Sequence, residues 1–403
     1  MSTSRPEDAS TLGSPVEVLW AFLRLGLTSF GGPVAHLAYF HAEFVKRRRW
    51  LDDSSYTDLV ALCQFLPGPA SSQVGMALGL LRAGWAGAGL AWLGFTLPSA
   101  LLLILFAYGI ASHGELASSG AVHGLKVVAV AVVAQAVWGM ARSLCPDRLR
   151  VGLAILAALL TLALPSALAQ VGAILACGVA GWLWLRLSQP PELPHLDYGI
   201  SPRVGLAALA CFGSLLFGLP WLAAATVSPL WSLVDGFYRA GSLVFGGGHV
   251  VLPLLQAIVV PDGIVSNADF LAGYGAAQAV PGPLFTFAAY LGAMMPSPLN
   301  GWVGGLLFLL VIFAPAFLLL VAALPFWDML RRRAALRNAI AGINAGVVGL
   351  LLSALYDPVW TSAIAGRTDF GLALAAFGLL VYARISPLWV VLFGAIAGSW
   401  LTG

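Results

Sequence analysis

The stretch Arg24-Leu25-Gly26-Leu27-Thr28-Ser29-Phe30-Gly31-Gly32 decides the fold, because its markers return later in the chain. Arg24, Gly26, Phe30, Gly31 and Gly32 recur as Arg239, Gly241, Phe245, Gly246 and Gly247, each shifted by 215 residues. A second block, Gln64-Phe65-Leu66-Pro67-Gly68-Pro69, recurs with a shift of 214 as Gln278-Ala279-Val280-Pro281-Gly282-Pro283. Pro98 is matched by Pro315. The same markers in the same order at nearly constant spacing indicate an internal duplication.

The composition places this duplication in a membrane. Of the 403 residues, 60% are hydrophobic and 9% are charged, and the mean hydropathy is +0.91. Soluble proteins are about half apolar and about a quarter charged, so a soluble enzyme, a nucleic-acid-binding module and a disordered chain are excluded. We expect an all-α polytopic membrane protein. Its spanning segments are expected near residues 85–111, 122–140, 151–164, 167–185, 204–221, 302–326, 339–355, 370–381 and 388–401.

Positive charge orients the two halves in opposite directions. In the first half, Lys46–Arg49 follows the Phe-Gly-Gly element, and the loop after the Pro98 helix carries Glu115 without a basic residue. In the second half Asp262 stands in the first of these places, and four arginines (Arg331, Arg332, Arg333 and Arg337) stand in the second. Because cytoplasmic loops carry an excess of Lys and Arg, the sequence predicts two homologous halves in inverted topology.

These observations divide the chain into four parts. We expect a cytoplasmic N-terminal segment over residues 1–15 and a first membrane repeat over residues 16–187. A polar, proline-rich linker follows over residues 188–203, and a second, inverted repeat occupies residues 204–403.

The elements broken by glycine and proline are expected to enter the membrane and return on the same side. Arg82 is assigned to the cytoplasm and Glu115 to the outside, so only one crossing remains between them, and Tyr56–Leu81 must be a re-entrant hairpin around its Pro-Gly-Pro turn. The Phe-Gly-Gly element is interpreted in the same way. The alternative for each element is a kinked helix that spans the membrane.

Broken helices at matching positions of two inverted halves point to a transporter's binding site. Each half-helix N-terminus is equivalent to about half an elementary charge, so four that converge would offer about +2 to an oxyanion. Arg24 and Arg239 stand six residues before each Phe-Gly-Gly, where a guanidinium could bind an oxyanion with two hydrogen bonds; the alternative is an interfacial arginine that snorkels. His36 and His249 do not superpose in the repeat, whereas Gln64 and Gln278 do.

Hydroxyl groups just past the turns, on Ser71, Ser72 and Thr286, are further candidate donors; for the glutamines, the alternative is a hydrogen bond between helices. The predicted substrate-binding residues are Arg24, Phe30, Gly31, Gly32, His36, Gln64, Pro67, Gly68, Pro69 and Ser71 in the first half, and Arg239, Phe245, Gly246, Gly247, Gly248, His249, Gln278, Pro281, Gly282 and Pro283 in the second.

Several kinds of chemistry lack their residues in this sequence. No carboxylate falls inside an uninterrupted span, which leaves a proton relay little to work with. The sequence contains no HExxH, P-loop or GxSxG motif, so we expect no enzymatic activity. Cys63, Cys145, Cys177 and Cys211 form no CxxC pair, and we expect neither a metal site nor a cofactor.

The sequence resembles the chromate ion transporter family. Phe30-Gly31-Gly32-Pro33 with His36, Arg48-Arg49-Trp50-Leu51 and Gln64–Pro69 look like its first-half signature, and Phe245–His249 followed by Gly273–Phe285 resembles its second half. The resemblance covers both halves, as in the long, two-domain form. It implies a multi-pass protein of the bacterial inner membrane that exports chromate and confers chromate resistance, with sulfate as analogue and competitor.

Export of a dianion has a sufficient driving force in the membrane potential. Moving one charge across 100 mV is worth about 2.3 kcal/mol, so a dianion that leaves a negative interior gains about 4.6 kcal/mol. This corresponds to a gradient of roughly a thousandfold or slightly more. Two alternatives stay open: an uptake carrier for sulfate or another oxyanion, and an anion channel. The expected partners are chromate and the lipid bilayer, without nucleic acid, and a homodimer is one of the open oligomeric states.

Overall fold

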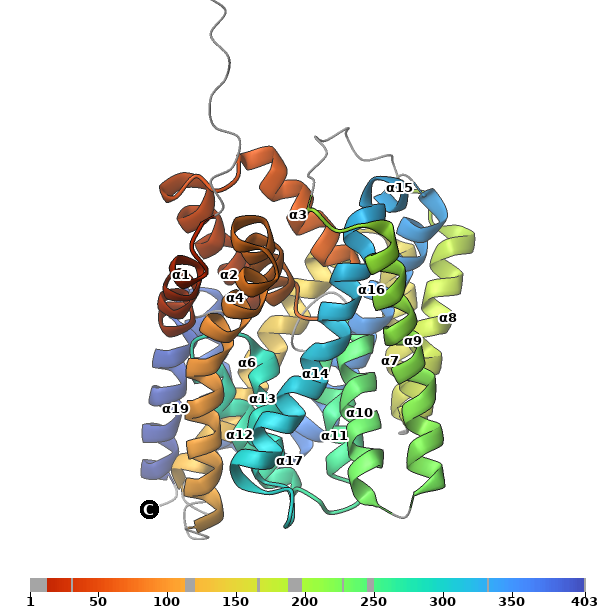
Figure 1. The fold of residues 1–403 in the computed structure, drawn as a ribbon. Helices are drawn as coiled ribbons and strands as arrows, with labels where there is room; N and C mark the ends of the chain where they lie inside the picture. Colours follow the sequence, from red (N-terminus) through yellow and green to blue (C-terminus); the bar gives the residue numbers. More distant parts are fainter. Residues whose placement is uncertain are drawn as a thin grey trace, which may run out of the picture.

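The protein is helical throughout the part that the structure describes. The computed structural model describes residues 13–29, 32–112, 120–164, 167–187, 198–226, 228–244, 250–331 and 333–401, and every regular element in these ranges is a helix (Figure 1). In the first repeat these are α1 (Pro15–Thr28), α2 (Gly32–Phe40), the π-helix η1 (His41–Arg47), α3 (Asp53–Phe65), α4 (Ala70–Ser112), α6 (Gly120–Leu144), α7 (Arg148–Ala163) and α8 (Ala167–Trp184).

The rest of the chain continues in the same way. The elements are α9 (Pro202–Ala225), α10 (Pro229–Leu243), α11 (Val251–Val259), α12 (Asn267–Ala279), the 3₁₀ turn η3 (Leu284–Thr286), α13 (Phe287–Ala293), α14 (Gly301–Ala323), η4 (Leu324–Phe326), α15 (Trp327–Arg331), α16 (Ala334–Ala354), η5 (Leu355–Trp360), α17 (Thr361–Ala363), α18 (Arg367–Val381) and α19 (Pro387–Leu401). The all-α prediction is confirmed.

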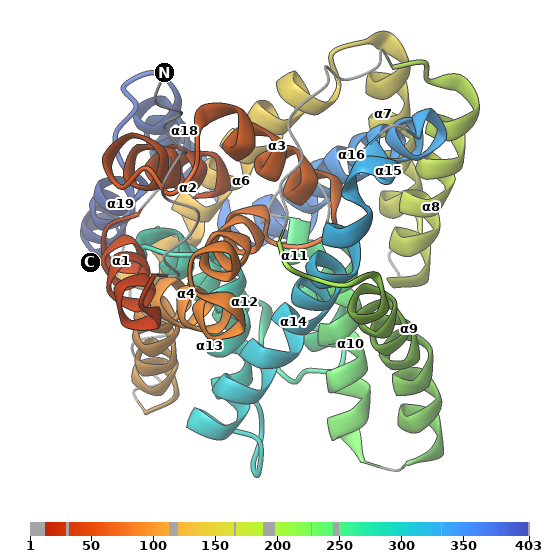
Figure 2. The same ribbon diagram turned by 45° about the horizontal axis from the view of Figure 1, so that its top comes forward.

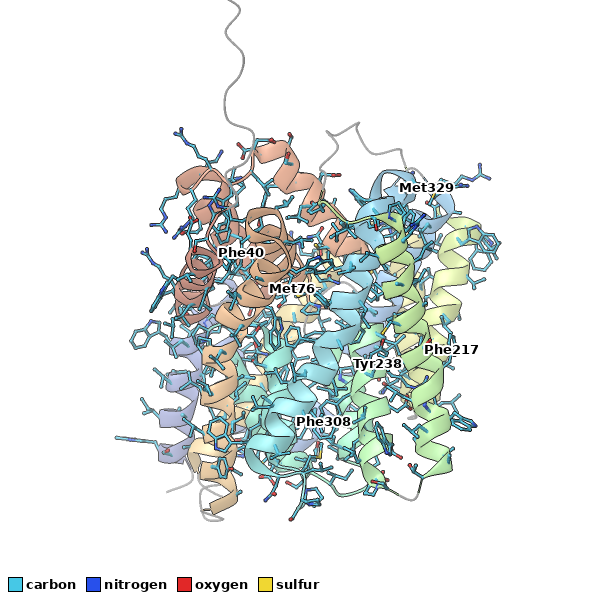
Figure 3. The ribbon with its side chains drawn as sticks, viewed as in Figure 1. Phe40, Met76, Phe217, Tyr238, Phe308 and Met329 are labelled. Atoms are coloured by element: carbon cyan, nitrogen blue, oxygen red, sulfur yellow. The ribbon has the colours of Figure 1, made fainter. Side chains whose placement is uncertain are left out.

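The outer surface of the bundle is apolar, as expected for a protein surrounded by lipid. Within the described residues, five helices are long and apolar enough to cross a membrane. Large hydrophobic side chains point outward from them, and Phe217 on α9, 78% exposed, is an example (Figure 3). Because water would penalise so much exposed apolar surface, this face is in contact with hydrocarbon, and the protein is a multi-pass membrane protein.

The Pro-Gly-Pro element of the first repeat is a re-entrant hairpin. α3 ends before the turn and α4 begins after it, but α4 is itself interrupted at Ala83 (φ −145°, ψ 28°) and Gly84 (φ 61°, ψ −154°). A Cβ built on Gly79 would lie 2.8 Å from the Cβ of Ala91, so the two parts of α4 run antiparallel. In a continuous helix these two residues would be about 18 Å apart. The chain therefore returns to its starting face at Ala83 before it crosses.

The equivalent element of the second repeat has the same shape. α12 leads to the turn, η3 and α13 lead back, and α14 then crosses. A Cβ on Gly292 would lie 3.0 Å from the backbone nitrogen of Gly305, which is the counterpart of the contact made by Gly79. The predicted pair of re-entrant hairpins is confirmed.

Both Phe-Gly-Gly elements are re-entrant as well. Glu17 near the start of α1 accepts a hydrogen bond from Arg48, just past η1, at 3.1 Å, so the chain leaves and returns at the same face. In the second repeat a Cβ on Gly236 of α10 would lie 2.9 Å from Cγ2 of Ile258 on α11. The breaks themselves, Phe30 and Gly31 in the first repeat and Phe245–His249 in the second, lie outside the described residues.

The two repeats are inverted, and α9 is the element that inverts them. Figure 1 shows η1 and α15, which carry or adjoin the basic clusters, at the top face, and the end of α4 and the start of α14 at the bottom. The second part of α4, α6, α7 and α8 make an even number of crossings, so the first repeat ends at the face where it began. α9, with which the predicted second repeat begins, adds one crossing, so α10 starts from the opposite face. By the positive-inside rule the top face is cytoplasmic.

The repeats exchange helices rather than form two separate bodies. α16 of the second repeat packs on α7 and α8 of the first, and α6 of the first packs on α18 and α19 of the second. Glycines allow the close approach: a Cβ on Gly181 would lie 2.5 Å from the Asn338 carbonyl oxygen, and one on Gly398 would lie 2.6 Å from the Gly124 nitrogen. In Figure 2, α7 and α8 lie on one side of the molecule and α18 and α19 on the other.

Asp52 caps the first helix of the Pro-Gly-Pro hairpin. Its Oδ1 accepts a hydrogen bond from the Ser55 backbone N–H at 2.8 Å, and hydrogen bonds from the Ser54 hydroxyl and from Ser55 lower the pKa of this carboxyl to about 2. Because the folded state lowers the pKa, the stabilisation is complete above the carboxyl's ordinary pKa and is lost as the pH falls towards 2.

We expect the variant Asp52→Ala to lose about 0.5–2 kcal/mol of stability at neutral pH. Thermal unfolding in detergent, followed at several pH values, measures this loss. Asp52→Asn keeps a capping oxygen and is expected to show a smaller loss without the acid-dependent part. Equal unfolding temperatures for Asp52→Ala and the wild type at pH 7 would contradict this role.

Candidate functional site

Two backbone hydrogen bonds join the broken elements of opposite repeats. The Gly68 N–H donates to the Val244 carbonyl at 2.6 Å, and the Gly282 N–H donates to the Ser29 carbonyl at 3.0 Å. Gly68 and Gly282 occupy the same place in the two Pro-Gly-Pro turns, and Val244 and Ser29 directly precede the two Phe-Gly-Gly breaks. These bonds join the four broken elements in two pairs, and a contact of 3.3 Å between His36 Nδ1 and Ser71 Oγ links one pair to the other. We call this region the central junction and define it by Ser29, Gly32, Gly68, Val244 and Gly282.

Only glycine fits the two turns at the central junction. Gly68 has φ +119° and Gly282 has φ +113°, a region that L-residues avoid. A Cβ on Gly282 would lie 2.7 Å from the Ser99 Oγ, and a Cβ on Gly68 would lie 2.7 Å from the Ala316 Cβ. Each turn thus packs against the proline-containing helix of the other repeat. The backbone hydrogen bonds likewise join each turn to the other repeat.

Two helix N-termini lie at the central junction, and the space beside them is small. α2 begins at Gly32 and α4 begins at Ala70, two residues past Gly68, whereas the second Pro-Gly-Pro turn leads into the 3₁₀ turn η3. A cavity of about 20 Å³ lies between Gly32, Gln278 and Gly282 and is also lined by Ala277, Val280, Leu284 and Pro387. This volume holds about one water molecule. The cavity is too small for a tetrahedral oxyanion.

Buried polar side chains lie on the elements that form the central junction, and several of their atoms have no hydrogen-bond partner within the protein. Burying such an atom without a partner costs about 1–3 kcal/mol, so an accumulation of them needs a reason. Most of these groups can donate: three hydroxyls, a ring nitrogen and an amide nitrogen. The atoms are Ser29 Oγ, His36 Nε2, Ser72 Oγ, Gln73 Oε1, Thr96 Oγ1 and Gln278 Nε2.

His36 connects two of the broken elements. Its Nδ1 lies 3.3 Å from the Ser71 Oγ, and its ring makes an edge-on contact with Phe95 at a centroid distance of 5.2 Å. α2 carries His36, whereas α4 carries both Ser71 and Phe95. Phe95 also borders Gly282, because a Cβ on that glycine would lie 3.2 Å from its carbonyl oxygen. The first-repeat histidine is therefore part of the cluster at the central junction.

The structure does not bring the two predicted arginines to the central junction. The Arg24 side chain is exposed on α1. Arg239 on α10 pairs with Asp235, Nε to Oδ1 at 2.7 Å, and donates to the Leu216 carbonyl at 3.3 Å. α1 and α10 lie on opposite sides of the molecule (Figures 1 and 2). The repeat places the two arginines at equivalent positions, but their surroundings differ.

The other predicted residues fall into three groups. Gly32, Gly68, Gly282 and Gln278 are at the central junction, and Pro67, Pro69, Pro281 and Pro283 shape its turns. Gln64 is exposed, and the Thr286 hydroxyl donates to the Pro283 carbonyl at 2.7 Å. The third group, Phe30, Gly31, Phe245, Gly246, Gly247, Gly248 and His249, lies outside the described residues.

Sequence reasoning missed Ser29, Gln73, Thr96 and Ser99. Their signal was present: each is a polar residue in an apolar helix, within a few residues of a break or of Pro98. Gln73 also holds the first turn, because its Nε2 donates to the Pro67 carbonyl at 2.9 Å and to the Ala316 carbonyl at 3.2 Å. In the described residues, no group of three or more His, Cys, Asp or Glu side chains could hold a metal ion.

Comparison with known proteins adds a family to this geometry. A family model described as Chromate transporter matches residues 16–182 and 231–399; the two segments leave α9 between them. The chain is 26% identical over 411 residues to the chromate transport protein of Cupriavidus metallidurans, covering 99% of this chain and 98% of that protein. It is 28% identical over 423 residues to the chromate transport protein of Pseudomonas aeruginosa, covering 99% and 96%. It is also 28% identical over 397 residues to an uncharacterized transporter of Methanocaldococcus jannaschii, covering 96% and 94%. No solved structure matches the chain.

Proposed function

The chain belongs to the chromate transporter family, and from that membership we propose that it exports chromate across a bacterial inner membrane and so confers chromate resistance. In this proposal the membrane potential drives export, and sulfate competes as an analogue of the same tetrahedral shape. The substrate binds at the central junction when the half-helices separate. The chain acts as a transporter and catalyses no covalent reaction.

The observation that carries the proposal is the set of unpaired donors at the central junction. Ser29, Ser72 and Thr96 each bury a hydroxyl without a partner, and Gln278 does the same with an amide nitrogen. A dianion with four oxygens accepts hydrogen bonds and donates none, so it matches this set. The N-termini of α2 and α4 add partial positive charge. Together these groups stabilise an anion without requiring a buried arginine.

The carboxylates near the broken elements are held in ion pairs or hydrogen bonds, which supports export driven by the membrane potential without proton coupling. Glu17 and Glu43 pair with Arg48 at the cytoplasmic face, at 3.1 and 2.6 Å. Asp235 pairs with Arg239, and Asp58 accepts a hydrogen bond from the Trp327 indole at 3.0 Å. A mechanism that couples protons through a carboxylate would need one of these to bind and release protons along the pathway. Each is instead tied to an arginine or to a neighbouring helix.

The proposal predicts that inside-out membrane vesicles take up labelled chromate in a saturable way when the vesicle interior is made positive. Collapse of the potential alone is expected to reduce the initial rate at least tenfold, because a dianion gains about 4.6 kcal/mol from 100 mV. Vesicles without the protein give the background. Unchanged uptake after the potential is collapsed would contradict the membrane potential as the driving force. Non-saturable uptake would favour an anion channel. Uptake of sulfate but not chromate would contradict chromate as the substrate.

A further inference from the structure

The inverted repeat sets up two equivalent places at the central junction. The first Phe-Gly-Gly element meets the second Pro-Gly-Pro turn through Ser29 and Gly282, and the second meets the first turn through Val244 and Gly68. If the two repeats carried the same side chains, the protein would hold two equivalent binding sites. Comparison of the residues at matching positions shows whether it does.

The matching positions carry different chemistry. The first repeat has polar residues at seven positions around the central junction, and the second repeat has apolar residues at six of them. With shifts of 214, 215 or 217 residues, Ser29, His36, Ser71, Ser72, Gln73, Thr96 and Ser99 are matched by Val244, Val251, Phe285, Thr286, Phe287, Phe313 and Ala316.

The second-repeat side is filled by packed hydrocarbon. Phe285 and Phe287 are completely buried, and Phe313 is 4% exposed. The rings of Phe285 and Phe313 lie 5.5 Å apart between centroids, and Phe287 stacks on Tyr290 at 5.9 Å. The one polar counterpart, Thr286, satisfies its hydroxyl on the Pro283 carbonyl at 2.7 Å. Among these positions, the second repeat therefore offers an anion no free side-chain donor. An anion placed against these rings would lose its water without gaining hydrogen bonds, which costs free energy.

The first-repeat side has the opposite character. Ser29, His36, Ser72 and Thr96 are at most 2% exposed, and each keeps one polar atom without a protein partner. Gln278 is the second-repeat residue that joins them, since it lines the same small cavity as Gly32 and Gly282. The side-chain donors for an anion at the central junction therefore belong to the first repeat and to Gln278, whereas the matching positions of the second repeat carry mainly aromatic rings.

We propose that the chain binds one tetrahedral oxyanion dianion at a time, at a single asymmetric site. Side chains of the first repeat (Ser29, His36, Ser72 and Thr96) and Gln278 bind the anion, and the second repeat supplies the apolar wall. This inference rests on the proposed function, because it takes the central junction as the substrate site. It goes further in assigning ligand roles to Ser29, Ser72 and Thr96 and in excluding a second, equivalent site.

Equilibrium binding of labelled chromate to the purified protein in lipid nanodiscs tests the proposal, with sulfate as second probe. We expect one bound anion per chain. Thr96→Val and Ser72→Ala are each expected to weaken binding about tenfold or more, because a hydrogen bond to a charged group is lost in a buried place. Thermal unfolding of the same samples shows that the variants remain folded.

Two matched variants serve as controls. Thr161 and Ser242 are also buried, but their hydroxyls donate to carbonyls of their own helices, at 2.9 and 2.8 Å. Thr161→Val and Ser242→Ala are expected to bind chromate as the wild type does. Two bound anions per chain, or wild-type affinity in Thr96→Val and Ser72→Ala, would overturn the asymmetric site and leave chromate export untouched. Binding of sulfate but not chromate, with the same effects of the variants, would support the site and contradict the proposed substrate.

Discussion

Gly282→Ala is expected to reduce chromate transport to less than about a tenth of the wild-type rate. Gly282 has φ +113°, and an added Cβ would lie 2.7 Å from the Ser99 Oγ and 3.2 Å from the Phe95 carbonyl oxygen. The backbone strain alone costs about 1–2 kcal/mol, and the methyl group would also push the turn away from Ser29, the acceptor of the Gly282 N–H. A loss of about 1.4 kcal/mol already corresponds to a factor of ten. Chromate uptake by inside-out vesicles that contain equal amounts of each protein measures the effect.

Gly263→Ala is a control that introduces an alanine at a positive φ without a steric contact. Gly263 also has a positive φ, +68°, but no atom lies within 4 Å of the position that an added methyl group would take. It belongs to the segment between α11 and α12, away from the central junction. We expect this variant to lose some stability and to keep its transport rate. If Gly282→Ala transported chromate as well as Gly263→Ala does, the close packing of the turn against α4 would have no part in transport.

His36→Leu is the second variant with a large expected effect. The change removes the hydrogen bond between Nδ1 and the Ser71 Oγ and also removes the nitrogen that has no protein partner. A hydrogen bond to a charged group contributes about 1.5–3 kcal/mol, so the Kd for chromate should rise about 10- to 100-fold. Competition binding against labelled chromate in nanodiscs measures the Kd directly.

Two further histidine variants define what this result means. His36→Gln keeps a donor of similar reach and is expected to recover part of the affinity. His41 stands five residues later and pairs with Asp53 at 2.7 Å near the cytoplasmic surface, so His41→Ala is expected to bind chromate normally. Equal losses in His36→Leu and His41→Ala would indicate that the first re-entrant element had been disturbed as a whole, and the role of His36 in binding would be contradicted.

The inverted, re-entrant architecture could be predicted because charge and helix-breaking residues act locally. Lys46–Arg49 and the Arg331–Arg337 region fix the cytoplasmic face whatever the packing. Once Arg82 lies on that face, the Pro-Gly-Pro segment has to return, and the interruption of α4 at Ala83 and Gly84 is where it does. The sequence also contained the signal for one more crossing, since the apolar run over residues 204–221 precedes the second set of repeat markers.

The exchange of elements between repeats could not be predicted, because it depends on contacts between residues that are far apart in the chain. Nothing near Gly68 indicates that its partner is Val244, and nothing near Gly342 indicates that it packs on α8. The surroundings of the arginines were hidden for the same reason. Arg24 and Arg239 occupy matching positions, yet the second has an acid four residues earlier, Asp235, where the first has Trp20.

The asymmetry of the central junction was available from the sequence once the repeats were aligned beyond their shared motifs. The markers that reveal a duplication are the residues that both halves keep, and these shape the backbone. The residues that differ, such as Thr96 against Phe313, carry the side-chain chemistry. A search for identities therefore finds the scaffold and passes over the donors.

The central claim is that the substrate binds at the central junction, on the side of the first repeat. The most direct measurement is a structure of the protein with molybdate, a tetrahedral dianion whose metal can be located by anomalous scattering. The account predicts one peak per chain, within hydrogen-bonding reach of His36, Ser72 and Thr96 and with the half-helices further apart than they are around the present small cavity. A peak beside Arg24 or Arg239, or two peaks related by the repeat, would contradict it.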